Sequence, residues 1–404
     1  MMPEPSTPRA SIPRHVGTGA RRLPPALLLL LAAAPLPLAA QDGIPWRAGY
    51  FPYFLGNPTT GPMLVLRYEY AQLADYEARV PYAGIFSAEA GASALGSRFL
   101  AARFRGPLLV DGWRFAGDLV AFRESRFGYY GLGPEAVGDP PPALAAEPYP
   151  FRARRARYWG RAEITRRLRG PLQAAAALTV DHERWSALPG QSVFRTEFGS
   201  EAQETDVKGR LSLVLDLRDH EFLTTRGLLG EAGLLVGSEG ALPGATGGGG
   251  SYGGWYAHVR GYFPAREGTV VAARVAARSY PGEASLGARF ELPAWERDVV
   301  AMGGAESHRS FVRGRFGGRG LLLGSLEVRH NLLDAGDYGG VTIVAFTDLG
   351  RVFESEDFTL SLSDLLVGYG GGLGFRILRQ ALLVLNFAGG PDGFNFSMGQ
   401  GWAF

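Results

Sequence analysis

The sequence contains no cysteine, and Lys208 is the only lysine among its 41 basic residues. The absence of cysteine excludes disulfide scaffolds, thiolate catalysis and cysteine-ligated metals. Because 39 acidic residues leave a formal net charge of only +2, the composition argues against a nucleic-acid-binding protein, which usually has a strong basic excess. Glycine, in contrast, accounts for 58 of the 404 residues, and aromatic residues for 12%. Transmembrane β-barrels share this composition.

Long apolar runs are also scarce, and the one present is Leu23–Ala40. Four arginines precede it, and small residues end it. This order predicts a secretory signal peptide over residues 1–40, cleaved before Gln41. The alternative is a membrane anchor, but the uninterrupted apolar core, Ala26–Ala34, is much shorter than the ~20 residues that span a bilayer.

After residue 40 there is no apolar stretch of 18 residues, so no transmembrane helix is expected. The exported chain is then either soluble or crosses a membrane as a closed sheet, which satisfies its own backbone polar groups. Runs of about 10–14 residues alternate apolar and polar side chains, for example around 211–218, 271–278 and 325–329. Strands of soluble sandwiches are shorter, at about 5–6 residues. We therefore expect residues 41–404 to form one all-β domain, a transmembrane antiparallel β-barrel of about sixteen strands.

The connections between these runs alternate between short and long, which is typical of such barrels. Short connections are expected at Gly106–Pro107, Arg169–Pro171, Asp219–Arg226, Pro264–Gly268, Leu333–Tyr338 and Leu378–Gln380. Long ones are expected at Phe127–Phe151, Ser186–Glu204, Gly240–Gly253, Pro281–Gly318 and Glu354–Ser363. The first strand, within Ile44–Gly56, contains two prolines, which cannot donate to a ladder. We expect it to be short and poorly paired with the last strand.

The last strand has aromatic residues of one parity and ends the chain on Phe404. Phe396, Trp402 and Phe404 together resemble the carboxy-terminal signal by which outer-membrane barrels are recognised for assembly. The alternative is an ordinary amphipathic terminal strand.

Several ordered motifs resemble the BamA/TamA family of outer-membrane barrels, the bacterial surface-antigen type. The segments that carry the resemblance are Tyr129–Gly133, Leu215–Asp219 with Thr224–Gly227, Phe311–Phe316, Ser325–Arg329 and Phe346–Phe353. Phe311–Phe316 is similar to the family's VRG(F/Y) loop motif, with Arg315 inserted before the aromatic residue. Thr224 stands where the family's turn motif usually has proline.

The resemblance implies a role for the VRG loop. In the family this loop folds back into the lumen, so Val312, Arg313, Gly314 and Phe316 would lie inside the barrel. Arg313 would pair with carboxylates on the next two strands, Glu327 and Asp348, the latter near Gly350. A guanidinium between two carboxylates makes bidentate, charge-assisted hydrogen bonds, and would lock the loop. The alternative is that Arg313 is a solvated loop charge.

The sequence also departs from the family, because only a few residues separate the expected signal peptide from the first strand. Family members normally carry periplasmic POTRA modules there, and these are expected to be missing. Three hypotheses follow. The barrel inserts or translocates proteins, or remodels lipid, through a weak seam between its first and last strands; it is a passive pore or structural barrel; or it is a barrel enzyme.

The third hypothesis finds little support. None of the six histidines forms an i, i+4 pair, and no nucleophile elbow or Walker loop occurs. We expect no enzyme activity, no metal and no cofactor. Arg161, Arg167, Arg274 and Arg278 either line a basic lumen or, as we prefer, pair with neighbouring carboxylates. The expected location is a Gram-negative-type outer membrane. The expected partners are lipid, unfolded outer-membrane clients and a separate periplasmic subunit, with no nucleic acid.

Overall fold

The structure is a computed structural model that describes residues 45–74, 78–134, 136, 138–240, 250–295, 299–300, 302–353, 363–377 and 381–404. The predicted signal peptide, the Leu378–Gln380 turn and nearly all of the Glu354–Ser363 loop lie outside these residues. In the described part of the chain, no helix is long and apolar enough to cross a membrane.

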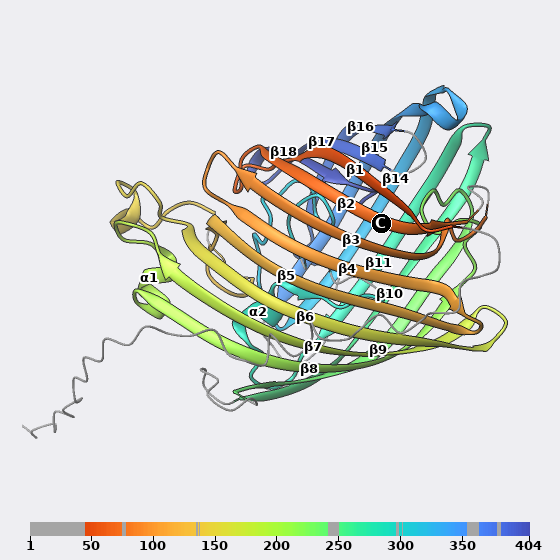
Figure 1. Ribbon diagram of the computed structural model, residues 1–404. Helices are drawn as coiled ribbons and strands as arrows, with labels where there is room; N and C mark the ends of the chain where they lie inside the picture. Colours follow the sequence, from red (N-terminus) through yellow and green to blue (C-terminus); the bar gives the residue numbers. More distant parts are fainter. Residues whose placement is uncertain are drawn as a thin grey trace, which may run out of the picture. The chain divides into compact units, whose positions relative to one another are not determined.

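Sixteen antiparallel strands follow one another round a single sheet in chain order (Figure 1). The first eight are β1 (Arg47–Leu55), β2 (Met63–Leu73), β3 (Tyr82–Ser93), β4 (Arg98–Val110), β5 (Trp113–Gly128), β6 (Arg152–Arg169), β7 (Leu172–Ala187) and β8 (Glu201–Asp216). The others are β9 (Gly227–Glu239), β10 (Ser251–Arg266), β11 (Thr269–Ser279), β14 (Gly320–Asp334), β15 (Gly339–Phe353), β16 (Leu366–Ile377), β17 (Ala381–Gly390) and β18 (Gly393–Gln400). The predicted sixteen-stranded antiparallel barrel is confirmed.

Short elements occupy the connections. They are η3 (Pro142–Leu144), α1 (Val193–Phe198), α2 (Leu286–Arg289), the two-residue strands β12 (Glu291–Leu292) and β13 (Val299–Val300), and η4 (Gly336–Tyr338). Because the strands alternate in direction, the connections alternate between the two ends of the barrel. We call these the short-turn end and the long-loop end.

The apolar and polar residues that alternate along the sequence lie on opposite faces of the sheet. Leu211 and Leu213 of β8 are 66% and 54% exposed, whereas Arg210 and Ser212, which precede them in turn, are buried. Leu326 and Val328 of β14 are likewise exposed, and their polar neighbours are buried. Apolar side chains therefore cover the outside of the barrel and polar ones the lumen, which is the arrangement that a bilayer requires.

One predicted turn is wrong. Gly106–Pro107 lies inside β4, which continues to Val110 before a tight turn at Asp111–Gly112. The register with β5 shifts between Gly106 and Val110. Such an irregularity leaves a residue out of the ladder, and it accommodates a proline that has no N–H to donate.

The barrel closes weakly. β1 has nine residues, half the length of β6, and pairs with β2 along its whole length. Between the described residues of β1 and β18, closure comes from one bridge beside β1, where Gly56 and Met398 exchange N–H···O bonds of 3.4 and 2.8 Å. The expected short first strand and its poor pairing with the last strand are both confirmed. We call this junction the seam.

Candidate functional site

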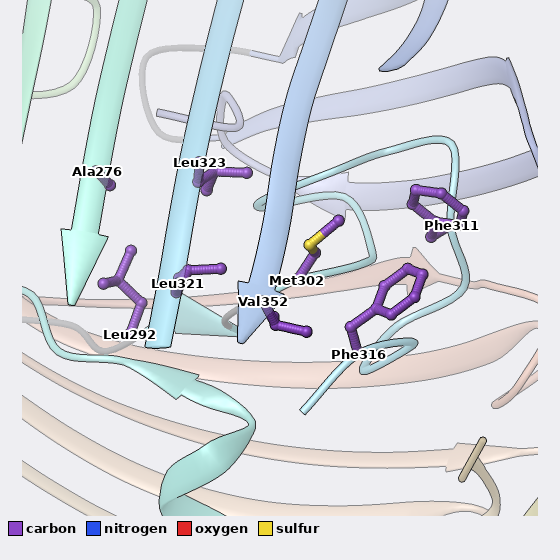
Figure 2. Packing of buried hydrophobic residues seen from close by; sticks show 8 residues of the cluster. All are labelled: Ala276, Leu292, Met302, Phe311, Phe316, Leu321, Leu323 and Val352. Carbon is purple, nitrogen blue, oxygen red and sulfur yellow. The ribbon is translucent and has the colours of Figure 1, made fainter. Parts of the chain in front are cut away.

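The described residues of the long connection between β11 and β14, which are 280–295, 299–300 and 302–319, fold back into the lumen. Its side chains Met302, Phe311 and Phe316 are buried together with Leu321 of β14 and Val352 of β15. Figure 2 shows these loop side chains gathered beside the two strands. The apolar cluster therefore holds the loop against the wall that carries the predicted carboxylates.

A buried guanidinium joins the loop to both carboxylates, and it belongs to Arg309. Its Nε and Nη2 donate to Asp348 at 2.9 and 2.8 Å, and its Nη1 donates to Glu327. The three side chains are at most 1% exposed. The guanidinium also lies 3.5 Å from the centroid of the Phe346 ring. We call Arg309, Glu327 and Asp348 the loop clamp.

The partner predicted for Arg313 is therefore wrong. Arg313 Nη1 donates instead to Glu124 of β5, at 2.7 Å, and the Arg313 side chain remains 29% exposed. The reason lies in the backbone, because the N–H of Arg309 itself donates to Asp348 at 2.8 Å. That bond fixes Arg309 against β15, and the chain has turned toward β5 by Arg313.

The other residues of the predicted motif shape the turn. Gly314 has φ +68, and a β-carbon there would overlap the Phe127 ring. The Val312 carbonyl accepts from the N–H of Arg315, at 3.1 Å. Gly350 of β15 faces the loop, because a β-carbon there would lie 3.2 Å from the Met302 side chain. Glycine at both positions lets the loop pack closely.

Further arginines of the wall bind the loop through its carbonyls. Arg278 donates to the carbonyls of Arg289 and Gly318 at 2.6 and 2.9 Å. Arg274 donates to Glu306 O at 2.8 Å and to Ser307 O at 3.2 Å.

The preferred carboxylate pairing is confirmed for Arg161, which lies 2.8 Å from Asp118. Arg167 is more than half exposed and lies 3.8 Å from Asp111. For Arg274 and Arg278 the bonds just described run to main-chain carbonyls of the loop. The predicted pairing with neighbouring carboxylates therefore holds for Arg161, but the bonds of Arg274 and Arg278 described above do not follow it.

The loop is also tied to the last two strands, next to the seam. Asn395 of β18 donates its amide to the carbonyls of Arg309 and Phe311, at 2.7 and 3.0 Å. Ser310 Oγ donates to Gly389 O of β17 at 2.9 Å. Sequence reasoning missed Arg309 and Asn395, because neither lies in a recognisable motif.

The carboxy-terminal residues do not continue the last strand as expected. Phe396 lies in β18 and packs on Phe387, with ring centroids 5.3 Å apart. The strand ends at Gln400, and Gly401 takes φ +83. Trp402 and Phe404 then line a cavity in the lumen, and the Phe404 carbonyl accepts from Arg329 at 2.9 Å. Because the chain turns at Gly401, Trp402 and Phe404 do not continue the alternating aromatic pattern of β18, although their spacing in the sequence fits it.

The clamp is strongly charged at neutral pH. Burial alone would lower the pKa of Arg309, but Glu327 and Asp348 outweigh burial and hold that pKa above its ordinary value. Burial also lowers the pKa of the adjacent His308, so its imidazole is neutral. Among the described residues, no group of three or more His, Asp or Glu side chains is placed to hold a metal ion. The arrangement is that of a mechanical tie.

Comparisons with known proteins agree with this architecture. A family model described as the Omp85 superfamily domain matches residues 86–402. BamA from Haemophilus ducreyi lacking POTRA domains 1–3 is 12% identical, with a TM-score of 0.53 over 88% of this chain and 70% of that one. CdiB from Escherichia coli is 14% identical, with a TM-score of 0.52 over 88% and 67%. No curated protein matches the sequence.

Proposed function

The chain belongs to the Omp85 superfamily, and from this premise we propose that it assists the assembly or translocation of other outer-membrane proteins through its seam. In this proposal residues 1–40 direct export, and residues 41–404 reside in the outer membrane. The role is non-enzymatic. The observation that carries the proposal is the single bridge between Gly56 and Met398 in the described residues of the junction.

The chemistry of the seam supports strand exchange. A strand edge without a partner presents a row of N–H and C=O groups, which is a template for another strand. An extended client segment can add to that edge through main-chain hydrogen bonds alone. Because β1 is fully paired with β2 on its other side, the template is held in place while the client strand adds.

The loop that carries the clamp supports this role by holding the last strands, which form the other side of the seam from β1. Arg309 ties the loop to β14 and β15, while Asn395 and Ser310 tie it to β18 and β17. The last strands are thus braced from within, which leaves β1 as the edge that separates. Lipid is the surrounding partner, unfolded barrel proteins are the clients, and a separate periplasmic subunit is the proposed supplier of clients.

A seam crosslink tests the proposal. Gly56→Cys with Met398→Cys introduces the only cysteines, and a hydrogen-bonded antiparallel pair has Cα atoms about 5.5 Å apart, within disulfide range. Purified protein in liposomes should speed the insertion of an unfolded barrel client. Oxidation of the pair should abolish the acceleration, and a reductant should restore it.

The matched control is Ala257→Cys with Ala277→Cys, which joins β10 and β11 at positions already paired in the sheet. Its oxidation should leave the acceleration unchanged. The proposal fails if the uncrosslinked protein gives no acceleration, or if the seam crosslink does not reduce it. A stable open conductance in planar bilayers with no client effect would instead establish the passive pore.

A further inference from the structure

A cavity of about 580 Å³ lies in the lumen near the short-turn end. Residues of the β2–β3 connection line it, as do residues of the β8–β9 connection and residues 400–404. Ligand pockets of proteins typically measure about 300–1,000 Å³, so this space accommodates a short peptide segment or a small molecule. It lies inside the barrel and is separate from the strand edge at the seam.

Cationic side chains dominate the polar wall of the cavity. Six arginines and two glutamates line it; the arginines are Arg67, Arg103, Arg105, Arg218, Arg260 and Arg329. The carboxylates just behind the wall are shared between arginines. Glu89 forms ion pairs with both Arg67 and Arg103. Asp118 forms ion pairs with Arg103, Arg105 and Arg161. Glu69, Asp216 and Glu327 pair with Arg67, Arg218 and Arg329 in the same way. The side chains that face the space itself are nevertheless six arginines against two glutamates, which favours an acidic ligand.

Aromatic rings form much of the remaining wall. They belong to Tyr82, Phe222, Tyr262, Trp295, Trp402 and Phe404. Rings and guanidiniums also stack on one another here, since the Arg329 guanidinium lies 4.6 Å from the Trp402 ring centroid. A wall of arginines and aromatic rings suits a ligand that carries both carboxylates and rings.

The protein's own residues show how this wall holds a peptide. A main-chain oxygen of Phe404, the last residue, accepts from Arg329 at 2.9 Å, and the peptide carbonyl of Ala403 accepts from Arg274 at 3.2 Å. The Phe404 ring lies 4.7 Å from the Arg274 guanidinium and packs on Tyr262. Both arginines are at least 95% buried. Main-chain oxygens and an aromatic side chain are thus already bound beside the cavity.

One buried donor without an acceptor lies behind the wall of the cavity. Among the described residues, Nη1 of Arg329 is buried with no hydrogen-bond partner, whereas its Nε and Nη2 are engaged by Glu327 and Phe404. A buried donor without a partner costs about 1–3 kcal/mol. Because this atom is not accessible from the cavity, recognition of a ligand rests on the arginine and aromatic groups that line the space, and not on this donor.

We propose that this cavity binds an extended peptide segment carrying acidic and aromatic side chains, which enters from the short-turn end and lies beside residues 401–404. The arginines recognise its carboxylates and carbonyls, and the rings receive its aromatic side chains. This binding goes beyond the assembly role at the seam and is measured without any client insertion.

The test is fluorescence anisotropy of labelled hexapeptides with the full chain in detergent. An alternating Asp/Phe peptide should bind at least ten-fold more tightly than a Lys/Phe peptide or an Asp/Ser peptide. Ser87→Trp fills the cavity from β3, where Ser87 is buried and lines the space, and should weaken binding at least ten-fold. Phe86→Trp, one position away on the outer face, should leave binding unchanged.

A second variant keeps the proposal testable if Ser87→Trp does not fold. Arg105→Gln removes one cavity charge, while Asp118 keeps Arg161 and Arg103 as partners, and it should weaken the Asp/Phe peptide at least five-fold. Equal binding of the three peptides, no effect of either cavity variant, or displacement by an equal concentration of glycerol phosphate would overturn the proposal. The last result would assign the site to a lipid headgroup. Loss of insertion activity in liposomes bears on the seam and not on this site.

Discussion

Arg309 and Asp348 are joined by three hydrogen bonds, because the backbone N–H of Arg309 donates to the same carboxylate as its guanidinium. The loop backbone and its side chain are thus bound to β15 at one point. Glu327 completes the clamp from β14. A tie that uses main chain and side chain together specifies which loop residue faces the wall, and it explains why the neighbouring Arg313 cannot replace Arg309.

Arg309→Ala should destabilise the barrel strongly. It removes the shared partner of two buried carboxylates, and breaking a buried pair costs about 3–5 kcal/mol. The measurement is the temperature at which the compact, heat-modifiable gel band is lost in detergent. Arg313→Ala breaks a single pair whose guanidinium is 29% exposed, although its partner Glu124 is buried, and should lower that temperature less than Arg309→Ala does. Equal shifts for the two variants would contradict the clamp.

Gly314→Ala should also destabilise the loop. The positive φ of 68° strains any L-residue by roughly 1–2 kcal/mol, and the added methyl overlaps Phe127, at about 1–3 kcal/mol more. Gly336→Ala is the matched control, since Gly336 has φ +58 with open space around it. The same gel assay should show the larger shift for Gly314→Ala. A shift no larger than that of Gly336→Ala would mean that the Phe127 ring moves to accommodate the added methyl group at little cost.

The barrel should lose stability in mild acid through His308. Because burial lowers its pKa in the folded state, the unfolded chain binds the proton first. The free energy of unfolding therefore falls once the pH drops below about 6.5, the ordinary value for histidine. Unfolding temperatures measured from about pH 7.5 to about pH 5.5 should fall less for His308→Gln than for the wild type. Parallel curves would remove His308 as the source.

Asn395→Ala should loosen the last strand from the loop. The variant removes this donor from the Arg309 carbonyl, whereas the Phe311 carbonyl still accepts from the N–H of Gly304 at 2.9 Å. The cost is that of one unsatisfied group, about 1–3 kcal/mol. Amide hydrogen exchange of β18 should then quicken relative to that of β7, on the far side of the barrel. Unchanged exchange in β18 would show that the loop does not brace the seam.

The sequence alone predicts the barrel because alternation along a strand has a direct structural counterpart. Leu211 and Ser212 must face opposite sides of a sheet, so their pattern determines which face meets lipid. The prolines near β1 likewise predict its weak pairing, since proline has no N–H to donate.

The site is harder to predict, because loop geometry depends on contacts that no local pattern encodes. Glu327 and Asp348 lie at predictable strand positions, but nothing in the loop sequence distinguishes Arg309 from Arg313 as their partner. The inward turn of Trp402 is similarly hidden, since its parity matches β18 and one φ at Gly401 changes the course of the chain.

The unpaired edge of β1 has a consequence for the surrounding bilayer. Acyl chains accept and donate no hydrogen bonds, so a polar backbone edge that faces them costs several kcal/mol for each group. In the outer membrane proposed for this chain, water or headgroups would have to reach this strand to satisfy its backbone groups, unlike the fully paired strands β7 and β8. The seam is thus the part of the wall that lipid tails alone cannot solvate.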